Sequence, residues 1–278
     1  MKELAKRSLV ALIGIPIILL AIYFGEIYFT ISLMFLSSLT LSEYYTIIEN
    51  KGAKPNNYWG ILFNNIFFLL VYLGFHNDNF NQWLLASVII FIIGSLSLQL
   101  LFAKNNAIIN IATTIGGIAY ISLFFISLLL IREFEYFFPL KYTFNAMQLV
   151  YSFIISIWIC DTAAYFVGSK YGKHKLLPNV SPKKSWEGAI AGFLGATASM
   201  ILINYLFSNL SIINSLLLGV IVGIAGQIGD LAESQLKRDA GVKDSSAMLP
   251  GHGGFLDRFD SILFVSPLIL VFLLIFNP

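Results

Sequence analysis

The sequence predicts an all-α fold, a polytopic helical bundle that is integral to a membrane. Two observations carry this prediction. Of the 278 residues, 58% are hydrophobic and only 12% are charged, whereas a soluble domain carries about 25% charged residues. The hydrophobic residues also gather into stretches of the ~17–25 residues that a helix needs to cross a bilayer. We expect these stretches to be helical, because lipid offers the backbone no hydrogen-bond partners.

Nine stretches are long and apolar enough to be membrane spans. The second carries an acid, Glu43, and the last is short and holds Pro267. The first is interpreted as a retained span, because no small-residue cleavage site follows it. The nine predicted spans are 8–24, 27–48, 58–75, 82–103, 107–131, 149–168, 188–207, 212–229 and 261–276.

The basic residues predict which side of the membrane each loop faces. With nine spans and a cytoplasmic N-terminus, only Arg132 and Lys141 of the 17 lysines and arginines fall outside the cytoplasmic segments. This bias follows the positive-inside rule. We therefore expect a multi-pass protein of the cell (inner) membrane whose two longest polar loops, 169–187 and 230–260, face the cytoplasm.

Composition also narrows the class of protein. The formal net charge of +2 is too small to indicate a nucleic-acid partner. The single cysteine, Cys160, excludes an intrachain disulfide. The chain is predicted to form one membrane domain, 1–278, with helices for packing and dimerisation in 1–148 and catalytic helices and loops in 149–278.

Three polar blocks interrupt the apolar C-terminal half. The first, residues 158–188, places Asp161 in the middle of an apolar stretch. A carboxylate there costs roughly 2.5–3.5 kcal/mol on insertion scales, which favours a functional acid over one that only pins helices together. Further on, SPKKS sets two lysines beside two hydroxyls at 181–185. That motif by itself is more typical of a positively charged cytoplasmic loop with solvated lysines.

The second block, GQIGDLAESQLKRD at 226–239, predicts that the eighth span continues into the cytosol as a helix. At 100° per residue, one arc of about 140° collects its polar side chains: Gln227, Asp230, Glu233, Ser234, Lys237 and Arg238. A merely solvated helix gives the same pattern. Asp230, however, sits at the predicted membrane boundary, where an unpaired acid is expensive, and this position favours a function.

The third block, VKDSSAMLPGHGGFLDRFDSILFV at 242–265, lies at the foot of the last span. Asp257 and Asp260 share a face if the last helix begins near Leu256. The helix dipole alone would explain acids in a first turn. The glycines around His252 form either a plain turn or a backbone that can approach a phosphate closely.

Acids near lysines and arginines on one side of a membrane indicate a chemistry. Such oxygen ligands suit Mg²⁺ held jointly by carboxylates and substrate phosphates. Phosphoryl-type transfer needs mainly positioning and charge neutralisation from a protein. The residues alone therefore indicate a Mg²⁺-dependent enzyme that handles the phosphates of a membrane lipid. An ion-coupled transporter stays open at this point, because intramembrane acids are equally typical there.

The second and third blocks together resemble the signature of the phosphatidate cytidylyltransferases, also called CDP-diacylglycerol synthases. The matching run is Ser234-x-Leu-Lys237-Arg238-x4-Lys243-Asp244-x-Ser-x2-Leu-Pro250-x-His252-Gly253-Gly254-Phe-x-Asp257-Arg258-Phe-Asp260. Upstream, CDTAAYFVGSKYGKHKL, SPKKSWEG and GQIGDLAES look like the family's other polar blocks, in the same order. Two departures are mild: Ser169 and Lys170 replace a common Gly-Arg pair, and Ser185 stands where Thr is common.

The resemblance implies that CTP and phosphatidate react to CDP-diacylglycerol and pyrophosphate, for phospholipid biosynthesis. It implies Mg²⁺, with K⁺ beside it as reported for family members, and a homodimer. The implied metal ligands are Asp230 and Asp257, supported by Asp260 and Asp161, and the implied catalytic residues are Asp230, Asp257, Lys237 and Arg258. The implied substrate-binding residues are Ser181, Lys183, Lys184, Ser185, Arg238, Lys243, His252, Gly253 and Gly254. The alternative is a CTP-dependent polyprenol- or phytol-type lipid kinase, in which the γ-phosphate moves instead.

Overall fold

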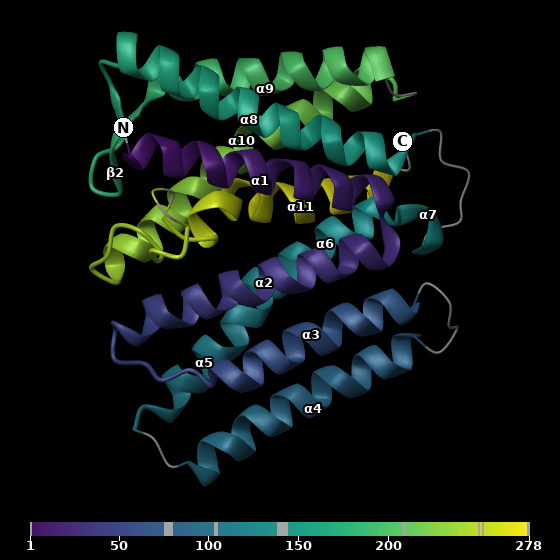
Figure 1. Cartoon of the computed structure of the whole chain (residues 1–278), viewed down its shortest axis with the longest axis vertical. Helices are drawn as coiled ribbons and strands as arrows, with labels where there is room; N and C mark the ends of the chain where they lie inside the picture. The colour runs from purple at the N-terminus through teal and green to yellow at the C-terminus, as the bar shows by residue number, and fades with distance from the viewer. Residues whose placement is uncertain are drawn as a thin grey trace. The chain divides into compact units, whose positions relative to one another are not determined.

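The computed structural model of the chain describes residues 2–74, 80–102, 105–137, 144–207, 210–249, 251 and 253–276. The helices are α1 (Lys2–Phe24), α2 (Glu26–Glu49), α3 (Asn57–Gly74), α4 (Phe80–Leu101), α5 (Ala107–Gly117), the π-helical turn η1 (Ile118–Ser122), α6 (Leu123–Arg132), α7 (Phe134–Phe137), α8 (Ala146–Tyr171), α9 (Trp186–Phe207), α10 (Ile212–Asp239) and α11 (Leu256–Phe276). The strands described are β1 (Lys175–Leu177) and β2 (Ser181–Ser185). The all-α prediction is confirmed (Figure 1).

Every predicted span falls in a helix. Among the described residues, eight helical segments are long and apolar enough to cross a membrane, and α5, η1 and α6 together form one of them, Ala107–Arg132. The first predicted span lies in α1, whose described apolar part, Leu12–Phe24, is shorter. The protein is thus a multi-pass helical membrane protein, and a ninth span in α1 stays a prediction.

Contacts divide the chain into two compact units, each built from two stretches of sequence. The first unit comprises 1–129 and 239–258, and the second comprises 130–238 and 259–278. These units are defined by contacts and not by function. The predicted division into packing helices, 1–148, and catalytic helices, 149–278, stays a prediction.

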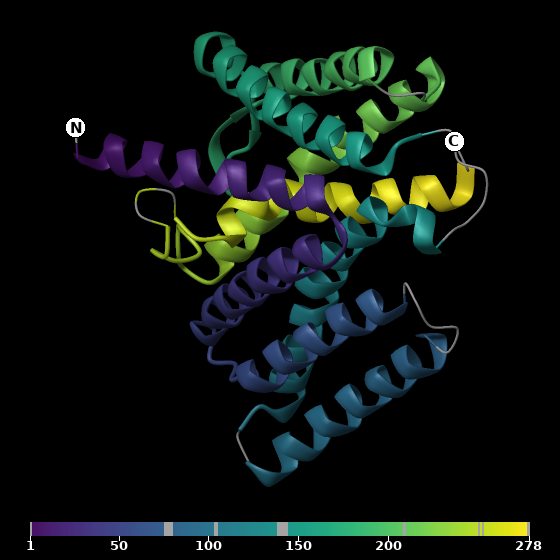
Figure 2. The same cartoon turned by 45° about the vertical axis from the view of Figure 1, so that its right-hand side comes forward.

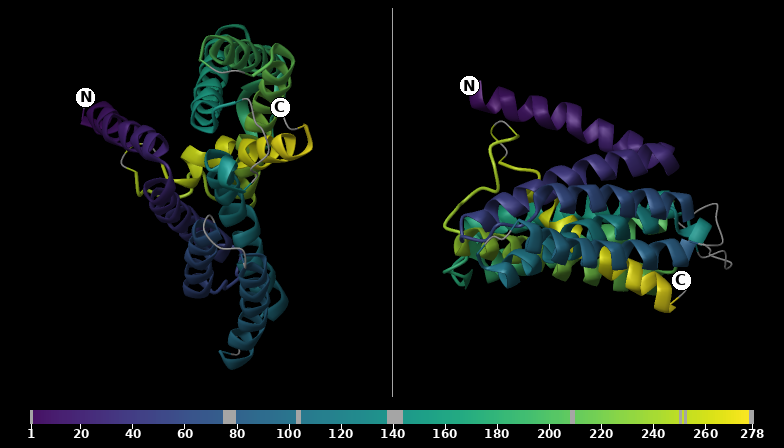
Figure 3. Two further views of the ribbon diagram at one scale, coloured as in Figure 1. Left: turned by 90° about the vertical axis from the view of Figure 1, so that its right-hand side faces the viewer. Right: turned by 90° about the horizontal axis from the view of Figure 1, so that it is seen from below.

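In the first unit, α2, α3 and α4 lie side by side in sequence order (Figures 1 and 3). Tyr45 of α2 is fully buried at their centre, and its hydroxyl donates to the carbonyl oxygen of Thr114 at 2.8 Å. A Cβ at Gly117 would come within 2.6 Å of the Tyr45 ring. The tyrosine and its glycine neighbour therefore set how closely α2 and the fifth span pack.

In the second unit, α8 and α9 form the closest helix pair (Figures 1 and 2). A Cβ at Gly188 would lie 2.7 Å from the carbonyl oxygen of Ala164, and one at Gly192 would lie 2.9 Å from that of Cys160. Small residues permit this backbone approach, as in other membrane helix pairs.

A β-hairpin joins α8 to α9, where the sequence predicted a polar loop. Lys175 pairs with Ser185 and Leu177 with Ser181 in an antiparallel ladder. The backbone N–H of Trp186 donates to the carbonyl oxygen of His174 at 2.9 Å and closes the hairpin at the start of α9. The SPKKS motif therefore lies on a strand, where successive side chains point to opposite faces.

Candidate functional site

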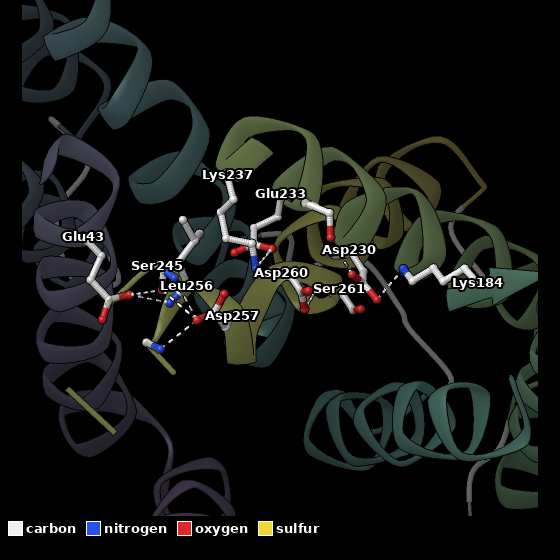
Figure 4. A network of polar contacts seen from close by, with 12 residues as sticks. Glu43, Lys184, Asp230, Glu233, Lys237, Ser245, Leu256, Asp257, Asp260 and Ser261 are labelled. Atoms are coloured by element: carbon white, nitrogen blue, oxygen red, sulfur yellow. Dashed lines mark hydrogen bonds and ion pairs between the residues drawn. The ribbon is translucent and has the colours of Figure 1, made fainter. Parts of the chain in front are cut away.

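The second unit holds an ion pair between two residues that the sequence singled out. The Nζ atom of Lys184, on strand β2, lies 2.5 Å from Oδ2 of Asp230, on α10 (Figure 4). The two side chains are 29% and 34% exposed. Solvent can therefore reach both groups, and the neighbouring Lys183 is exposed, as expected for the next residue along a strand.

Two further acids act on this ion pair. The charges of Asp230 and Asp161 both reach the half-buried Asp260, and so does the charge of Lys184. The Oδ1 atom of Asp260 accepts a hydrogen bond from the backbone N–H of Ser261 at 2.7 Å. The structure thus brings three of the predicted acids and one predicted lysine into one group, which we call the Asp230 cluster: Asp161, Lys184, Asp230 and Asp260.

Packing of α10 against the C-terminal part of α11 positions this cluster. The Ser261 hydroxyl donates to the carbonyl oxygen of Gly226 at 3.1 Å. A Cβ at Gly229 would lie 2.5 Å from the carbonyl oxygen of Asp260. Glycine at 229 therefore lets the two helices approach until Asp230 and Asp260 are electrostatic neighbours.

The extension of α10 to Asp239 confirms the predicted helical continuation. Its polar face does not simply face water, because Glu233 and Lys237 form a buried ion pair at 2.6 Å with side chains 1% and 10% exposed. Arg238, the next residue, is exposed. The lysine that the resemblance assigns to catalysis therefore has an acidic partner on its own helix.

The hairpin is tied to the start of α9. Glu187 accepts hydrogen bonds from the backbone N–H of His174 at 3.2 Å and contacts its Nδ1 atom at 2.6 Å. The buried Ser185 hydroxyl accepts a hydrogen bond from the N–H of Gly188 at 3.2 Å. Ser181 is half-buried at the other end of β2. The roles of both serines toward phosphates stay predictions.

In the first unit, the loop before α11 surrounds an open pocket of about 600 Å³. Its lining residues are Lys243, Asp244, Ser246, Ala247, Leu249, Gly251, Gly253 and Arg258. Gly251 and Gly253 have φ angles of 77° and 81°, a conformation that glycine adopts without strain. The pocket thus gathers two predicted cations, Lys243 and Arg258, beside a glycine turn. His252, also predicted here, lies outside the described residues.

Asp257 organises the same loop. Its Oδ2 atom accepts hydrogen bonds from the backbone N–H groups of Ser245 at 3.0 Å and Gly254 at 2.8 Å, and it lies 3.0 Å from the Ser245 hydroxyl (Figure 4). Helix α11 begins at Leu256, so Asp257 lies in its first turn, as the sequence predicted. The assignment of Asp257 as a metal ligand stays a prediction.

The sequence reasoning missed one acid. Glu43 of α2 is 2% exposed and accepts four hydrogen bonds from residues 245–256. A lone carboxylate in an apolar span was the available signal, since it is the pattern that drew attention to Asp161.

A divalent cation fits the Asp230 cluster in its donor chemistry. No three His, Cys, Asp or Glu side chains are grouped as a metal site among the residues that the structure describes. Mg²⁺, however, is commonly held by one or two carboxylates together with substrate phosphates. Asp230 already holds a cation, the Lys184 ammonium, and Asp260 adds a second carboxylate.

These features define a class: a multi-pass helical membrane protein with a group of carboxylates and a lysine on its helices and hairpin. The profile of the Cytidylyltransferase family matches residues 5–276, and the chain belongs to this family.

Relatives at two levels of similarity agree with this assignment. A Bacillus subtilis (strain 168) protein named phosphatidate cytidylyltransferase is 33% identical over 282 residues, which cover all of both chains. Proteins of that name from Staphylococcus haemolyticus (strain JCSC1435) and Staphylococcus aureus (strain COL) are each 46% identical, over 127 and 129 residues. These two matches cover 45% of this chain and 48% of each relative, so the chain spans about half the length of the staphylococcal proteins.

Proposed function

We propose that this protein transfers the cytidylyl group of CTP to phosphatidate and so forms CDP-diacylglycerol and pyrophosphate. The ion pair between Lys184 and Asp230 carries the proposal. It places a cation for phosphates beside a carboxylate for a metal ion, both partly open to solvent, on two segments that resemble the family's polar blocks. The names of the relatives support the same reaction. They do not favour a lipid kinase.

The reaction needs no covalent intermediate with the protein. A phosphate oxygen of phosphatidate is already anionic near neutral pH, so it attacks the α-phosphorus of CTP without a strong general base. The new P–O bond forms as the bond between the α-phosphorus and the bridging oxygen breaks. Pyrophosphate leaves with the electron pair of that bond. The main task is to orient two polyanions and to offset their charge.

The lysines of the hairpin suit the triphosphate. Lys184 already pairs with Asp230, and Lys183, the residue before it on β2, is exposed. Arg238 and Lys237 at the end of α10, and Lys243 and Arg258 of the loop pocket, are proposed to hold the lipid phosphate or the pyrophosphate.

Mg²⁺ is the proposed cofactor, with K⁺ as a second cation. Within the second unit, Asp230 and Asp260 would hold the divalent ion, with Asp161 in support. The ligand role of Asp257 that the resemblance implies stays a prediction. When bound, it would neutralise phosphate charge. Each carboxylate would supply a negative charge that holds the cation beside these helices.

We further propose that the reaction takes place at the cytoplasmic face of the cell (inner) membrane. The distribution of lysine and arginine supports this orientation. Water-soluble CTP would reach the loops there, while phosphatidate stays anchored in the bilayer. A homodimer remains a prediction from the resemblance.

Isotope placement tests the reaction. Purified protein in phosphatidate micelles with Mg²⁺ is given CTP labelled at either the α- or the γ-phosphorus. Cytidylyl transfer puts only the α-label into lipid and the γ-label into pyrophosphate. Label from the γ-position in lipid would instead show a kinase, and no labelled lipid from either substrate would refute both enzymes.

Metal dependence is tested in the same assay. EDTA is expected to abolish transfer, and added Mg²⁺ is expected to restore it. Activity that persists in excess EDTA would remove the divalent ion from the proposal.

A further inference from the structure

Glu43 is a buried carboxylate in α2, flanked in sequence by Ser42 and Tyr44. It lies in α2, one of the segments long and apolar enough to span a membrane, and it is 2% exposed. A carboxylate in such a segment is costly unless polar groups surround it. The hydrogen-bond donors that surround Glu43 therefore indicate its role.

Four hydrogen bonds to Glu43 come from the loop before α11 and from the start of that helix. Figure 4 shows two of these partners, Ser245 and Leu256. The Oε1 atom accepts from the Ser246 hydroxyl at 2.6 Å and from the Phe255 N–H at 2.9 Å. The Oε2 atom accepts from the Leu256 N–H at 2.8 Å and lies 3.0 Å from the Ser245 hydroxyl. Each carboxylate oxygen of Glu43 is thus paired with one serine hydroxyl and one backbone N–H group.

Two of these donors stand at the beginning of a helix. Leu256 is the first residue of α11, and Phe255 precedes it. N–H groups at a helix start have no partner within the helix, and the helix dipole favours a negative charge beside them. Glu43 therefore caps α11 from another helix, more than 200 positions away in sequence.

Asp257 holds the same loop from the other side. The Ser245 hydroxyl lies 3.0 Å from both Glu43 Oε2 and Asp257 Oδ2. Between the two carboxylates lies Gly254, where a Cβ would come within 2.6 Å of Glu43 Oε1. Both acids thus contact the same loop, and a side chain at 254 would have to displace the Glu43 carboxylate or the Ser245 hydroxyl.

We propose that Glu43 is a positioning residue for the cytidylyl transfer. It holds the loop that contains Ser245 and Ser246, and the start of α11, in the conformation in which Lys243 and Arg258 line their shared pocket. It touches the loop and not the phosphates, so its effect on the reaction passes through the loop. This inference rests on the proposed function for its catalytic part and on the contacts of Glu43 alone for its structural part.

The test compares Glu43→Gln with Glu49→Gln. The first substitution keeps size but replaces one acceptor oxygen with an NH₂ group that faces two donors. Glu49, on the same helix, is exposed and accepts one hydrogen bond from the Asn57 side chain at 3.3 Å, so it makes a matched control. Three quantities are measured for each: amide hydrogen exchange by mass spectrometry, kcat and KM for the transfer, and the melting temperature.

In Glu43→Gln, exchange is expected to rise about 10-fold or more in peptides holding the amides of Phe255 and Leu256, because local opening governs their exchange. The kcat is expected to fall about 10–100-fold, since a small misplacement of binding groups has effects of this size. KM and the melting temperature should change little, and Glu49→Gln should match wild type throughout. Ser246→Ala, which removes one donor, should show the same changes at smaller size.

Each other result has a definite meaning. Unchanged exchange at 255–256 in Glu43→Gln and in Ser246→Ala overturns the contact as a constraint on the loop. Faster exchange with wild-type kcat overturns the positioning role. A melting temperature that falls in parallel with kcat, with faster exchange throughout α2 and α3, shows only general stability and also overturns it. An inactive wild-type protein would refute the proposed function, while the exchange comparison would still decide whether Glu43 holds the loop.

Discussion

Two groups of acids in this protein are held in opposite ways. Glu43 and Asp257 accept hydrogen bonds from neutral donors, which are backbone N–H groups and serine hydroxyls. Asp230 instead faces the ammonium of Lys184, and its neighbour Asp260 lies within range of two further charges, those of Asp161 and Asp230.

This difference in hydrogen-bond partners indicates that the two groups of acids have different roles. A buried carboxylate that satisfies several neutral donors cannot change partners without leaving those donors unpaired, at about 1–3 kcal/mol each. A half-exposed ion pair is worth only about 0–1 kcal/mol, so another cation or a phosphate can replace one member at little cost. We therefore assign ligand exchange to the Asp230 cluster and maintenance of shape to Glu43.

The largest effect should follow from Asp230→Asn. Removal of this charge is expected to lower turnover by at least about 10³-fold, because charge stabilisation of a phosphate transfer is lost at its centre. Insertion and melting temperature should stay normal. Asp239→Asn is the control, since Asp239 is exposed and paired with Lys51 at 3.0 Å. Turnover within 10% of wild type in Asp230→Asn would contradict the assignment of ligand exchange to this cluster.

Asp257→Asn should come next. Turnover is expected to fall by about 10²-fold or more, and to fall further than in Glu43→Gln, because Asp257 would support the cation as well as the loop. An asparagine oxygen can still accept from Ser245 and Gly254, so exchange at these amides should rise only slightly. Near-normal turnover would remove Asp257 from the proposed metal ligands.

Lys184→Gln should have an intermediate effect. The KM for CTP is expected to rise about 10–100-fold, the size of one charge-assisted hydrogen bond. Lys183→Arg keeps a positive charge on the exposed face of β2 and should change KM by no more than about 3-fold. The KM of each variant, measured over a range of CTP concentrations, shows whether Lys184→Gln has the larger effect. A larger loss in Lys183→Arg would reverse the roles given to the two lysines.

The smallest effect should follow from Glu187→Gln. Glu187 contacts His174 and so ties the hairpin to α9, but the histidine side chain is 79% exposed. Such an exposed contact contributes little, so the KM for CTP should rise only about 2–5-fold. The measurement is the KM, with hydrogen exchange of 173–185 as a second readout. An effect as large as that of Lys184→Gln would show that Glu187 acts on more than the hairpin.

Hydropathy and helical periodicity predicted most of the architecture. The nine apolar stretches all lie in helices, α10 continues to Asp239, and α11 begins at Leu256. These features could be predicted because they depend on neighbours a few positions apart. The motifs that resemble the family likewise located the three acids and the one lysine of the Asp230 cluster, since residue identity alone carries that resemblance.

Three features could not be predicted in this way. SPKKS became a strand because it pairs with 175–177, and no apolar alternation announces such a short exposed hairpin. The polar pattern of α10 left open whether Glu233 and Lys237 are solvated, and the structure shows that they are buried together. The contacts of Glu43 could not be foreseen, because its partners lie more than 200 positions away in sequence.

The sequence by itself therefore determined the class of fold, the number of helical stretches and the family. Local hydrophobic pattern and a long run of specific residues are enough for these. Only the tertiary structure showed which carboxylates accept hydrogen bonds from neutral donors and which face a lysine. That distinction depends on the donors that reach each acid, and for Glu43 the Ser245 hydroxyl arrives from 202 positions away.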